Sequence, residues 1–474
     1  MNTSKYKRII FSLGASGLLL WGMFLLLSGS PRIARANAGD LFVTTTGGGD
    51  CSQPNPCDLQ TALGMAVDGD SIYIAEGTYI GEGGAVITLT HSINLYGGWD
   101  GTTTMLIVRI PDLYPTTIDG EMERRVIYIS GNTSPVIDGL IITRGMATDG
   151  GGIYIDQASA IVQHNIIKDN HTITGGAYDD GRGGGVFIGY TSDATITQNS
   201  IINNMSGYGG GIYHNGNITG TITANEIVNN DVTYRGGGIM VENAPDIIQT
   251  NIISGNTALG DGGGMLIWHA LSLIEANRII SNTAANGGGI SMGNNARPDI
   301  INNLMINNIK DGIYSFSSSP VVANNTLDGG SLSGSGNGLD LYARSDCTPP
   351  YCMEGNFIDN IITGYEIGIY GNGPITPVLD YNDVWSNSTV DYSLPSGVVI
   401  GVHDISLDPL FRNLSFDDYR LQASSPCVDA GTDAGVMSDI DGNTRPVGAG
   451  YDIGAYEYTP QWEIFLPLVV NIDH

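Results

Sequence analysis

Short runs of alternating apolar and polar residues recur through the middle of the chain. Residues 235–256, RGGGIMVENAPDIIQTNIISGN, contain one unit: three glycines, an apolar stretch, a Pro-Asp break, a second apolar stretch and two asparagines. Alternation with a period of two predicts strands that each bury one face. The glycines and the Pro-Asp pair predict turns between these strands.

The unit repeats at a nearly constant interval. The third glycine of the triplet recurs at spacings of 33, 26, 27, 26 and 25 residues, at Gly152, Gly185, Gly211, Gly238, Gly264 and Gly289. The asparagine pair keeps the same interval, at Asn165/Asn170, Asn199/Asn204, Asn225/Asn230, Asn251/Asn256, Asn277/Asn282 and Asn303/Asn308. A fixed period in the twenties indicates a solenoid, and the abundance of Gly, Asn, Ile and Thr favours strands over helices.

Aligning the units places like residues in columns. The position three before the first asparagine holds only Ile or Val, at Val162, Ile196, Ile222, Ile248, Ile274, Ile300 and Val322. Stacking such columns builds parallel sheets, and inward asparagines can then bond to the copies above and below. The sequence therefore predicts an all-β, right-handed parallel β-helix of about 22–27 residues per coil with an asparagine ladder.

The N-terminal segment has the pattern of a secretory signal. Three bases precede the apolar run at residues 9–27, and Ala36-Asn37-Ala38 fits a signal-peptidase site. Residues 1–38 are therefore predicted to be a signal peptide. The apolar run is also long enough to span a bilayer, so an uncleaved anchor is the alternative.

The remaining boundaries follow from where the repeat begins and fades. Residues 39–93 are predicted to form an N-terminal cap and the first strands, 94–375 the β-helix repeats, and 376–474 an irregular C-terminal module and tail. The cap includes a short amphipathic helix that would close the end of the core and protect its strand edges. Its apolar face is formed by Leu59, Ala62, Leu63, Ala66 and Val67.

Charge and cysteine usage agree with export. The chain carries 48 acidic and 19 basic residues, a formal net charge of −29, which excludes a basic nucleic-acid-binding surface. Cys51 and Cys57, like Cys347 and Cys352, are spaced for local disulfides in an oxidising compartment. Cys427 is left over and is predicted to be a buried small apolar residue rather than a nucleophile.

Two parts of the chain resemble known families. The glycine- and asparagine-rich coils, from about residue 40 to 375, resemble bacterial right-handed parallel β-helix repeat proteins of the broad pectate-lyase-like class. The C-terminal stretch is similar to the choice-of-anchor Q module, in DPLF (408–411), YRLQASSPCVDAG (419–431) and DIGAYE (452–457). The first resemblance implies a long outer face that holds polysaccharides. The second implies a secreted or surface protein whose C-terminus directs sorting or attachment, although the final IFLPLVVNIDH fits a last packed strand equally well.

Outward positions after the glycine triplets place aromatic rings beside carboxylates and amides. Such groups can stack on sugar rings and bond their hydroxyls. The candidate glycan-binding residues are Tyr154, Asp156, Phe187, Tyr213, Asn215, Glu242 and Trp268. The alternative is an ordinary exposed sheet whose side chains only support strand pairing. Opposite charges also alternate just before the triplets, at Asp149, Arg182, Tyr208, Arg235, Asp261 and Asn286.

No complete catalytic set is evident in the sequence. The Gly-His-Gly and Arg-Ile-Lys segments of hydrolases in the resembling class are absent, and beyond the signal segment only Lys168 and Lys310 offer a lysine base. The longest coil inserts HTITGGAYDDGR, residues 171–182, and extra loops on a solenoid often carry function. Its acid–base candidates are His171, Asp179, Asp180 and Arg182. The two adjacent carboxylates could equally cap a turn or bind a stray cation.

One further segment suggests a metal. DIDGN, residues 439–443, resembles half of a calcium loop and makes Asp439, Asp441 and Asn443 candidate Ca²⁺ ligands, although the other ligands of an EF-hand are missing.

The sequence as a whole predicts a secreted or cell-surface protein that presents an elongated face to a polysaccharide or cell-surface glycan, as an adhesin or scaffold does. Membrane contact is expected only through an uncleaved N-terminal segment or a C-terminal sorting system. The alternative function is a secreted polysaccharide lyase or glycoside hydrolase with its site near the loop at residues 171–182.

Overall fold

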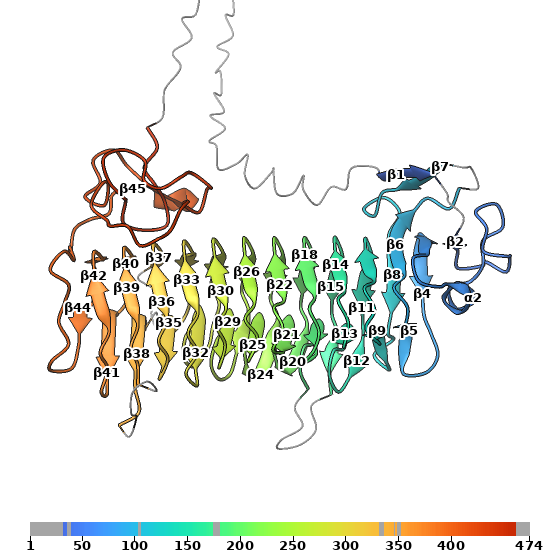
Figure 1. Cartoon of the computed structure of the whole chain (residues 1–474), viewed down its shortest axis with the longest axis horizontal. Helices are drawn as coiled ribbons and strands as arrows, with labels where there is room; N and C mark the ends of the chain where they lie inside the picture. Colours follow the sequence, from blue (N-terminus) through green and yellow to red (C-terminus); the bar gives the residue numbers. More distant parts are fainter. Residues whose placement is uncertain are drawn as a thin grey trace, which may run out of the picture.

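The computed structural model describes residues 32–35 (backbone only), 39–102, 106–173, 181–330, 336–345, 347 and 352–460. The chain winds into a right-handed β-helix whose coils stack along one long axis (Figure 1). Each full coil gives one strand to each of three long sheets, and these strands pair in parallel with those of the next coil. The predicted fold class is therefore confirmed.

The first sheet has fifteen strands and begins with an antiparallel pair, β1 and β7. Its strands are β1 (Arg32–Arg35), β7 (Leu106–Arg109), β6 (Asn94–Trp99), β10 (Val136–Asp138), β14 (Ile161–Gln163), β18 (Thr195–Thr197), β22 (Thr221–Thr223), β26 (Ile247–Gln249), β30 (Leu273–Glu275), β33 (Asp299–Ile301), β36 (Val321–Ala323), β39 (Asn356–Ile358) and β42 (Val378–Asp380), with β2 (Asp40–Val43) and β3 (Ser71–Ala75) joined at β6.

The second sheet has twelve parallel strands, which follow those of the first sheet after a tight turn. They are β4 (Gly77–Tyr79), β8 (Thr116–Asp119), β11 (Ile141–Thr143), β15 (Ile166–Lys168), β19 (Ser200–Ile202), β23 (Glu226–Val228), β27 (Ile252–Ser254), β31 (Arg278–Ile280), β34 (Leu304–Ile306), β37 (Thr326–Asp328), β40 (Ile361–Thr363) and β43 (Asp383–Trp385).

The third sheet also has twelve strands, preceded in five coils by a short extra strand. Its strands are β5 (Ala85–Leu89), β9 (Arg125–Ser130), β13 (Ile153–Asp156), β17 (Val186–Ile188), β21 (Ile212–Asn215), β25 (Ile239–Glu242), β29 (Met265–Trp268), β32 (Ile290–Gly293), β35 (Asp311–Phe316), β38 (Asn337–Tyr342), β41 (Ile367–Asn372) and β44 (Val390–Ser393). The short strands are β12 (Met146–Ala147), β16 (His171–Thr172), β20 (Met205–Tyr208), β24 (Asp231–Arg235) and β28 (Thr257–Ala258).

The interior consists of the predicted columns. Ile248 of β26 pairs in register with Ile222 and Ile274, and all three side chains have no exposed surface. Beside them the asparagines form the expected ladder: the Nδ2 of Asn251 donates to Oδ1 of Asn277 at 3.0 Å and to the carbonyl of Ile222 at 2.8 Å. Because successive amides along the ladder are bonded in this way, the ladder satisfies polar groups that would be costly to bury unpaired.

The glycine triplets form the corner before the third sheet. Gly236 has a left-handed φ of +71°, which a residue with a side chain adopts only with strain. A Cβ on Gly238 would lie 2.6 Å from the carbonyl oxygen of Gly264 on the next coil. The triplet therefore supplies both the backbone turn and the close approach between coils.

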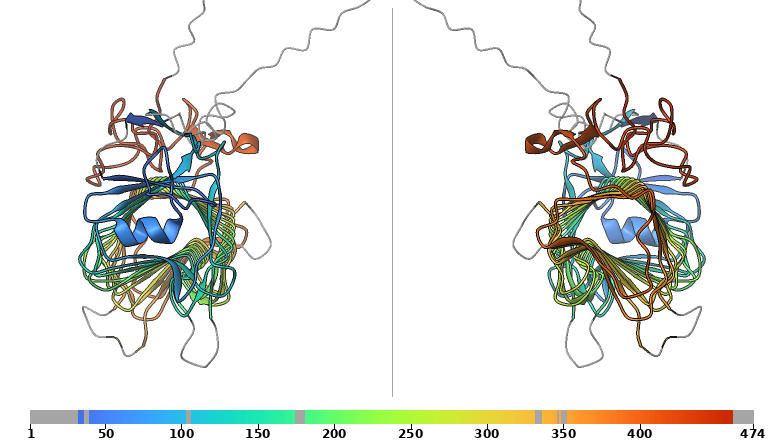
Figure 2. Two further views of the ribbon diagram at one scale, coloured as in Figure 1. Left: turned by 90° about the vertical axis from the view of Figure 1, so that its right-hand side faces the viewer. Right: turned by 90° about the vertical axis from the view of Figure 1, so that its left-hand side faces the viewer.

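A short helix closes the N-terminal end, as Figure 2 shows from both ends of the molecule. The helix α2 (Leu59–Met65) begins at Asp58, whose side chain accepts a hydrogen bond from the Thr61 N–H at 2.9 Å. Leu59 and Ala62 are buried, whereas Val67 is 59% exposed, so the predicted apolar face is one residue too long. Val67 lies beyond the last residue of the helix, Met65, so it does not belong to the buried face of the helix.

The C-terminal residues first continue the solenoid and then fold over it. Parallel pairing runs past residue 375 through β42, β43 and β44, so the last coil lies inside the range expected for the module. Beyond it, a hairpin of β45 (Phe411–Asn413), η1 (Leu414–Phe416) and β46 (Asp418–Leu421) covers the second sheet. Its apolar contact with that sheet uses Leu304, Ile306 and Ile361, which face outward from their strands.

Candidate functional site

The outer face of the third sheet carries a column of large side chains in strict register. Tyr154, Phe187, Tyr213, Met240 and Leu266 pair one with the next across five coils. The first three rings stack, with centroids 4.7 Å apart between Tyr154 and Phe187 and 5.6 Å apart between Phe187 and Tyr213. Together these side chains form a second apolar cluster, outside the coil interior.

This column is mostly covered, contrary to the expectation from the sequence. Phe187 and Tyr213 are only 5% and 2% exposed, so neither ring face is available to a sugar. Some of the covering side chains come from the corners that precede the glycine triplets, and Trp268 comes from the end of β29. Tyr208 and Trp268 pack on the cluster at its edge and remain half-buried.

Two arginines provide much of the cover. The guanidinium of Arg182 lies over the rings of Phe187 and Tyr213, at 5.3 and 5.7 Å, and that of Arg235 lies 5.4 Å from the Trp268 ring. Each arginine is held by the carboxylate of the neighbouring coil, Arg182 by Asp149 at 2.8 Å and Arg235 by Asp261 at 3.0 Å. The alternating charges seen in the sequence are therefore ion pairs that fix the arginines over aromatic rings.

Between these side chains runs a groove with a volume of about 280 Å³. We call it the third-sheet groove, and it is lined by Arg182, Tyr208, Tyr213, Arg235, Met240, Glu242 and Trp268. Glu242 and Trp268 are partners in register on β25 and β29, and the next residue of that column is Gly293. A Cβ on Gly293 would lie 2.5 Å from the Trp268 ring, so the absence of a side chain there lets the indole lie flat along the sheet.

The electrostatics of the groove favour binding over proton transfer. The Tyr213 hydroxyl donates a hydrogen bond to Glu242, and burial together with this carboxylate raises the pKa of Tyr213 above its ordinary value. The hydrogen bond to Asp149 raises the pKa of Arg182. Neither group can therefore serve as a base near neutral pH. Among the described lining residues Glu242 is the one carboxylate, and it already accepts a hydrogen bond from the Tyr213 hydroxyl.

The predicted site residues divide between the groove and the rest of this face. Tyr213, Glu242 and Trp268 line the groove, as does the catalytic candidate Arg182. The remaining predicted residues, Tyr154, Asp156, Phe187, Asn215 and His171, do not line it. His171 lies in β16, paired with Met146 and Met205 of the adjacent coils. Asp179 and Asp180 lie outside the described residues.

Sequence reasoning missed two contributors to the groove, Tyr208 and Arg235. Both were noticed only as members of an edge column of alternating charge. Their position directly before a triplet was the available signal, because the sharp glycine corner brings that residue back over the sheet it precedes. Arg182 is the acid–base candidate that lines the groove, and its ion pair with Asp149 holds it over the rings of Phe187 and Tyr213.

The predicted calcium ligands form a self-contained turn instead. Oδ1 of Asp439 accepts the N–H groups of Asp441 and Asn443, and its Oδ2 accepts the Asn443 amide and the Glu457 N–H. Asp441 pairs with Arg420 at 2.8 Å. Both oxygens of Asp439 and Oδ2 of Asp441 therefore already accept hydrogen bonds from the protein. Within the described part of the chain, no group of three or more His, Cys, Asp or Glu residues could hold a metal.

The cysteines behave as predicted. Cys51 is joined to Cys57 and Cys347 to Cys352, each in a local disulfide. Cys427 is free and fully buried, and its thiol donates to Oδ2 of Asp383 at 3.1 Å. Burial raises the pKa of Cys427 well above its ordinary value, which excludes a thiolate nucleophile at neutral pH.

Comparison with known proteins agrees with the fold. A family model described as the right handed beta helix region matches residues 117–272 and 184–349. No curated protein matches the sequence. Across the described residues, no helix is both long enough and apolar enough to span a membrane.

Several solved structures have a similar overall shape. The pectate lyase Pel9A has 14% identity and a TM-score of 0.49, covering 90% of this chain and 98% of its own. The PL6 family alginate lyase AlyGC has 15% identity and a TM-score of 0.41, covering 81% of this chain and 57% of its own. The PL6 family polysaccharide lyase Pedsa3628 from Pseudopedobacter saltans has 13% identity and a TM-score of 0.41, covering 89% and 100%. Likeness at this level identifies no site.

Proposed function

We propose that this chain is an exported β-helix protein that binds a glycan chain in the third-sheet groove. The observation that carries the proposal is the half-buried indole of Trp268 in the groove, which has the Arg235 guanidinium 5.4 Å from its ring and Glu242 as its partner in register. A sugar has an apolar ring face and several hydroxyls. The indole can pack on the ring face, and the guanidinium N–H groups and the carboxylate can form hydrogen bonds with the hydroxyls.

The charge of the groove favours a neutral glycan. Both of its arginines are matched by carboxylates of the neighbouring coils, so the groove carries no excess of cations. The chain as a whole is strongly acidic, with a formal net charge of −29, and therefore repels polyanions at low salt. Export, a cleaved signal at residues 1–38 and surface attachment through the choice-of-anchor Q-like module belong to the same proposal.

Retention on immobilised polysaccharides tests the groove. The purified protein is passed over a panel of plant, algal and bacterial polymers, together with a Trp268→Leu variant. Loss of the indole contact, worth about 1 kcal/mol, should weaken retention about fivefold. Tyr190→Leu is the matched control, because that ring is 56% exposed on a turn that does not line the groove. Equal retention of all three proteins would refute the proposal.

A polysaccharide lyase or glycoside hydrolase is the second candidate function. Arg182, the last residue of the predicted catalytic loop, lines the groove where a glycan would lie. The same incubations therefore include measurement of new reducing ends and of the ultraviolet absorbance of unsaturated sugars. Product that disappears in an Asp179→Ala, Asp180→Ala variant would establish an enzyme. Retention without product supports binding alone.

A further inference from the structure

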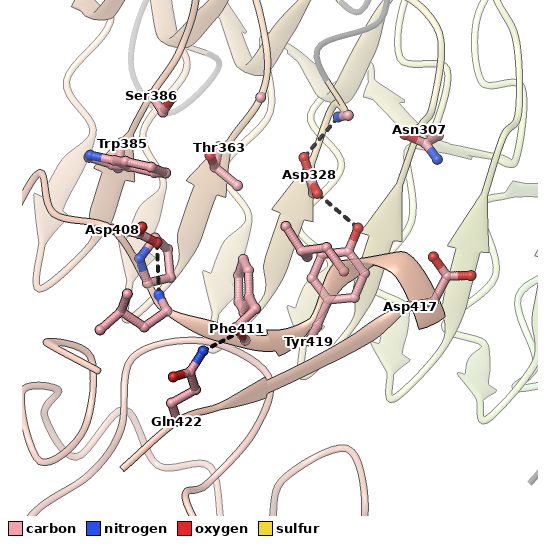
Figure 3. A pocket seen from close by; sticks show the side chains of 15 residues that line it. Asn307, Asp328, Thr363, Trp385, Ser386, Asp408, Phe411, Asp417, Tyr419 and Gln422 are labelled. Carbon is pink, nitrogen blue, oxygen red and sulfur yellow. Dashed lines mark hydrogen bonds between the residues drawn. The ribbon is translucent and has the colours of Figure 1, made fainter. Parts of the chain in front are cut away.

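A second and larger cavity lies where the C-terminal hairpin crosses the second sheet. Its volume is about 650 Å³, within the range of about 300–1,000 Å³ that is typical of ligand pockets. We call it the junction cavity. Figure 3 shows its labelled side chains between the strands of the second sheet and the β45–β46 hairpin.

The floor of the cavity is a column in register on three successive coils. Asp328 ends β37, Thr363 ends β40 and Trp385 ends β43, and each pairs directly with the next. The roof is the hairpin with the segment that precedes it, which contributes Asp408, Phe411 and others. The cavity therefore exists only while the hairpin is docked on the solenoid.

One polar side chain of the floor points to a ligand. Thr363 is only 8% exposed and lines the cavity, and its hydroxyl has no hydrogen-bond partner among the described residues. The residue is largely covered, but its hydroxyl is not among the fully buried unpaired atoms and so faces the open space of the cavity. A bound group with a donor or an acceptor would satisfy it.

The charges of the cavity select the kind of ligand. Its carboxylates are Asp328, Asp408 and Asp417, and none of its described lining residues is Lys, Arg or His. None of the three forms an ion pair within the described part of the chain. Asp328 accepts hydrogen bonds from the Tyr419 hydroxyl and the Gly330 N–H, both at 2.8 Å. Asp408 uses Oδ1 for the Leu410 N–H at 2.9 Å, and its Oδ2 has no described partner.

The aromatic lining adds a stacking surface. The Trp385 indole is half-buried beside the exposed Asp408, and the apolar atoms of Leu410 and Phe411 complete that end of the cavity. Carboxylates next to an indole attract a cation more strongly than either group alone, since the ring face adds a cation–π attraction. The three carboxylates are too dispersed to form a metal-binding group. An extended ligand with one positive charge fits better.

We propose that the junction cavity binds an amino-sugar unit whose protonated amine is held by Asp408, at the end of the cavity where Trp385 lies. The sugar ring packs on Trp385, and one of its hydroxyls bonds to Thr363. This site is separate from the third-sheet groove, on a different sheet, and it selects for positive charge where the groove does not. It therefore holds or fails independently of the proposed function.

Calorimetric titration with two matched probes tests the proposal. A glucosamine trimer and its fully N-acetylated counterpart are titrated into the purified protein at about pH 6, where the free amine is protonated. The amine form should bind and the acetylated form should bind at least about fivefold more weakly, because acetylation removes the charge. No binding of the amine form, or equal binding of the two, would overturn the proposal.

Variants then place the binding in the cavity. Asp408→Asn should lower the affinity for the glucosamine trimer about fivefold, and its amide oxygen can still accept the hydrogen bond from the Leu410 N–H. Asp433→Asn is the matched control, since Asp433 also accepts the N–H two residues on, at 3.0 Å, but lies outside the cavity. Trp385→Leu should weaken binding as well, and Trp268→Leu should not. If neither Asp408→Asn nor Trp385→Leu changes the affinity for the trimer, the trimer binds elsewhere and the proposed site is wrong.

Discussion

The third-sheet groove and the junction cavity are built on outer faces of the same solenoid, yet their charges are arranged in opposite ways. In the groove, Arg182 and Arg235 are each neutralised by an aspartate of a neighbouring coil. In the cavity, three carboxylates have no basic partner among the described residues. The repeat fixes what lies inside each coil, and it leaves the outward positions free to differ from coil to coil.

The two regions also differ in how they are covered. The groove is roofed by side chains that come from its own coils, whereas the cavity is roofed by a hairpin that follows the last coil. Contacts such as the hydrogen bond from Tyr419 to Asp328 join residues far apart in sequence. The groove is therefore a local property of the repeats, and the cavity depends on docking.

The interior that both regions share should give the largest effect. Asn251→Ala removes the acceptor of the Asn225 N–H, at 2.9 Å, and the donor to the Ile222 carbonyl. Because these buried groups are then left unpaired, the free energy of unfolding should fall by about 3 kcal/mol or more. Denaturant unfolding measures this, with the exposed Asn217→Ala as control, expected to change stability by less than about 0.5 kcal/mol. A small effect at Asn251 would contradict the ladder's role.

The second prediction separates the two regions by pH. Burial raises the pKa of Asp359 and of Asp383 to about 7 at the junction, where they accept the Thr432 N–H and the Cys427 thiol. A carboxyl group with a raised pKa in the folded state stabilises that state fully below about pH 4. This contribution is lost as the pH rises through about 7. The effect is on the order of 4 kcal/mol per group.

The melting temperature of the protein should therefore fall between about pH 4 and pH 7. Asp359 faces Arg445, Asp380 and Glu457 as well as Thr432. The Asp359→Asn variant should therefore show a smaller fall of the melting temperature with rising pH. Hydrogen exchange should locate the loosening in residues 405–460 rather than in the coils that form the groove. A pH response of equal size in the groove coils, or an unchanged slope in the variant, would contradict this difference.

The smallest effect is expected from the guanidinium that covers Trp268. Arg235→Lys keeps the charge opposite Asp261 but loses the planar group that stacks on the indole. Glycan retention should fall about two- to fivefold, because an exposed cation–π contact is worth about 0.5–1 kcal/mol. Binding of the glucosamine trimer should not change. If the lysine variant retains the glycan fully, Arg235 has no specific part in the groove.

The parts of this structure that repeat could be predicted from the sequence. Ile248 and Asn251 recur in every coil, so their alignment alone indicated an inward column and a ladder. The left-handed residues before the asparagines, such as Thr250 with φ 55°, could not be predicted, because their side chains differ from coil to coil. The ladder amides fix that backbone, whichever residue occupies the position.

Features that depend on contacts between unlike segments were not predictable. Alternation correctly placed Phe187 on an outward face, but it could not show that Arg182 would bend back over the ring. The DIDGN segment predicted calcium ligands, but the sequence could not show that Asp439 accepts hydrogen bonds from Asn443 within the same turn. The junction cavity joins β40 and β43 to a segment that carries no repeat, so periodicity contained no signal for it.

The most direct test of the account is a cross-titration of two variants against two ligands. Trp268→Leu and Trp385→Leu are each measured with the glycan retained from the polysaccharide panel and with the glucosamine trimer. We predict that Trp268→Leu lowers the affinity for the glycan alone and that Trp385→Leu lowers the affinity for the trimer alone, each about fivefold. If either variant weakens both ligands, or neither variant weakens its own, the molecule does not carry two separate sites of opposite charge preference.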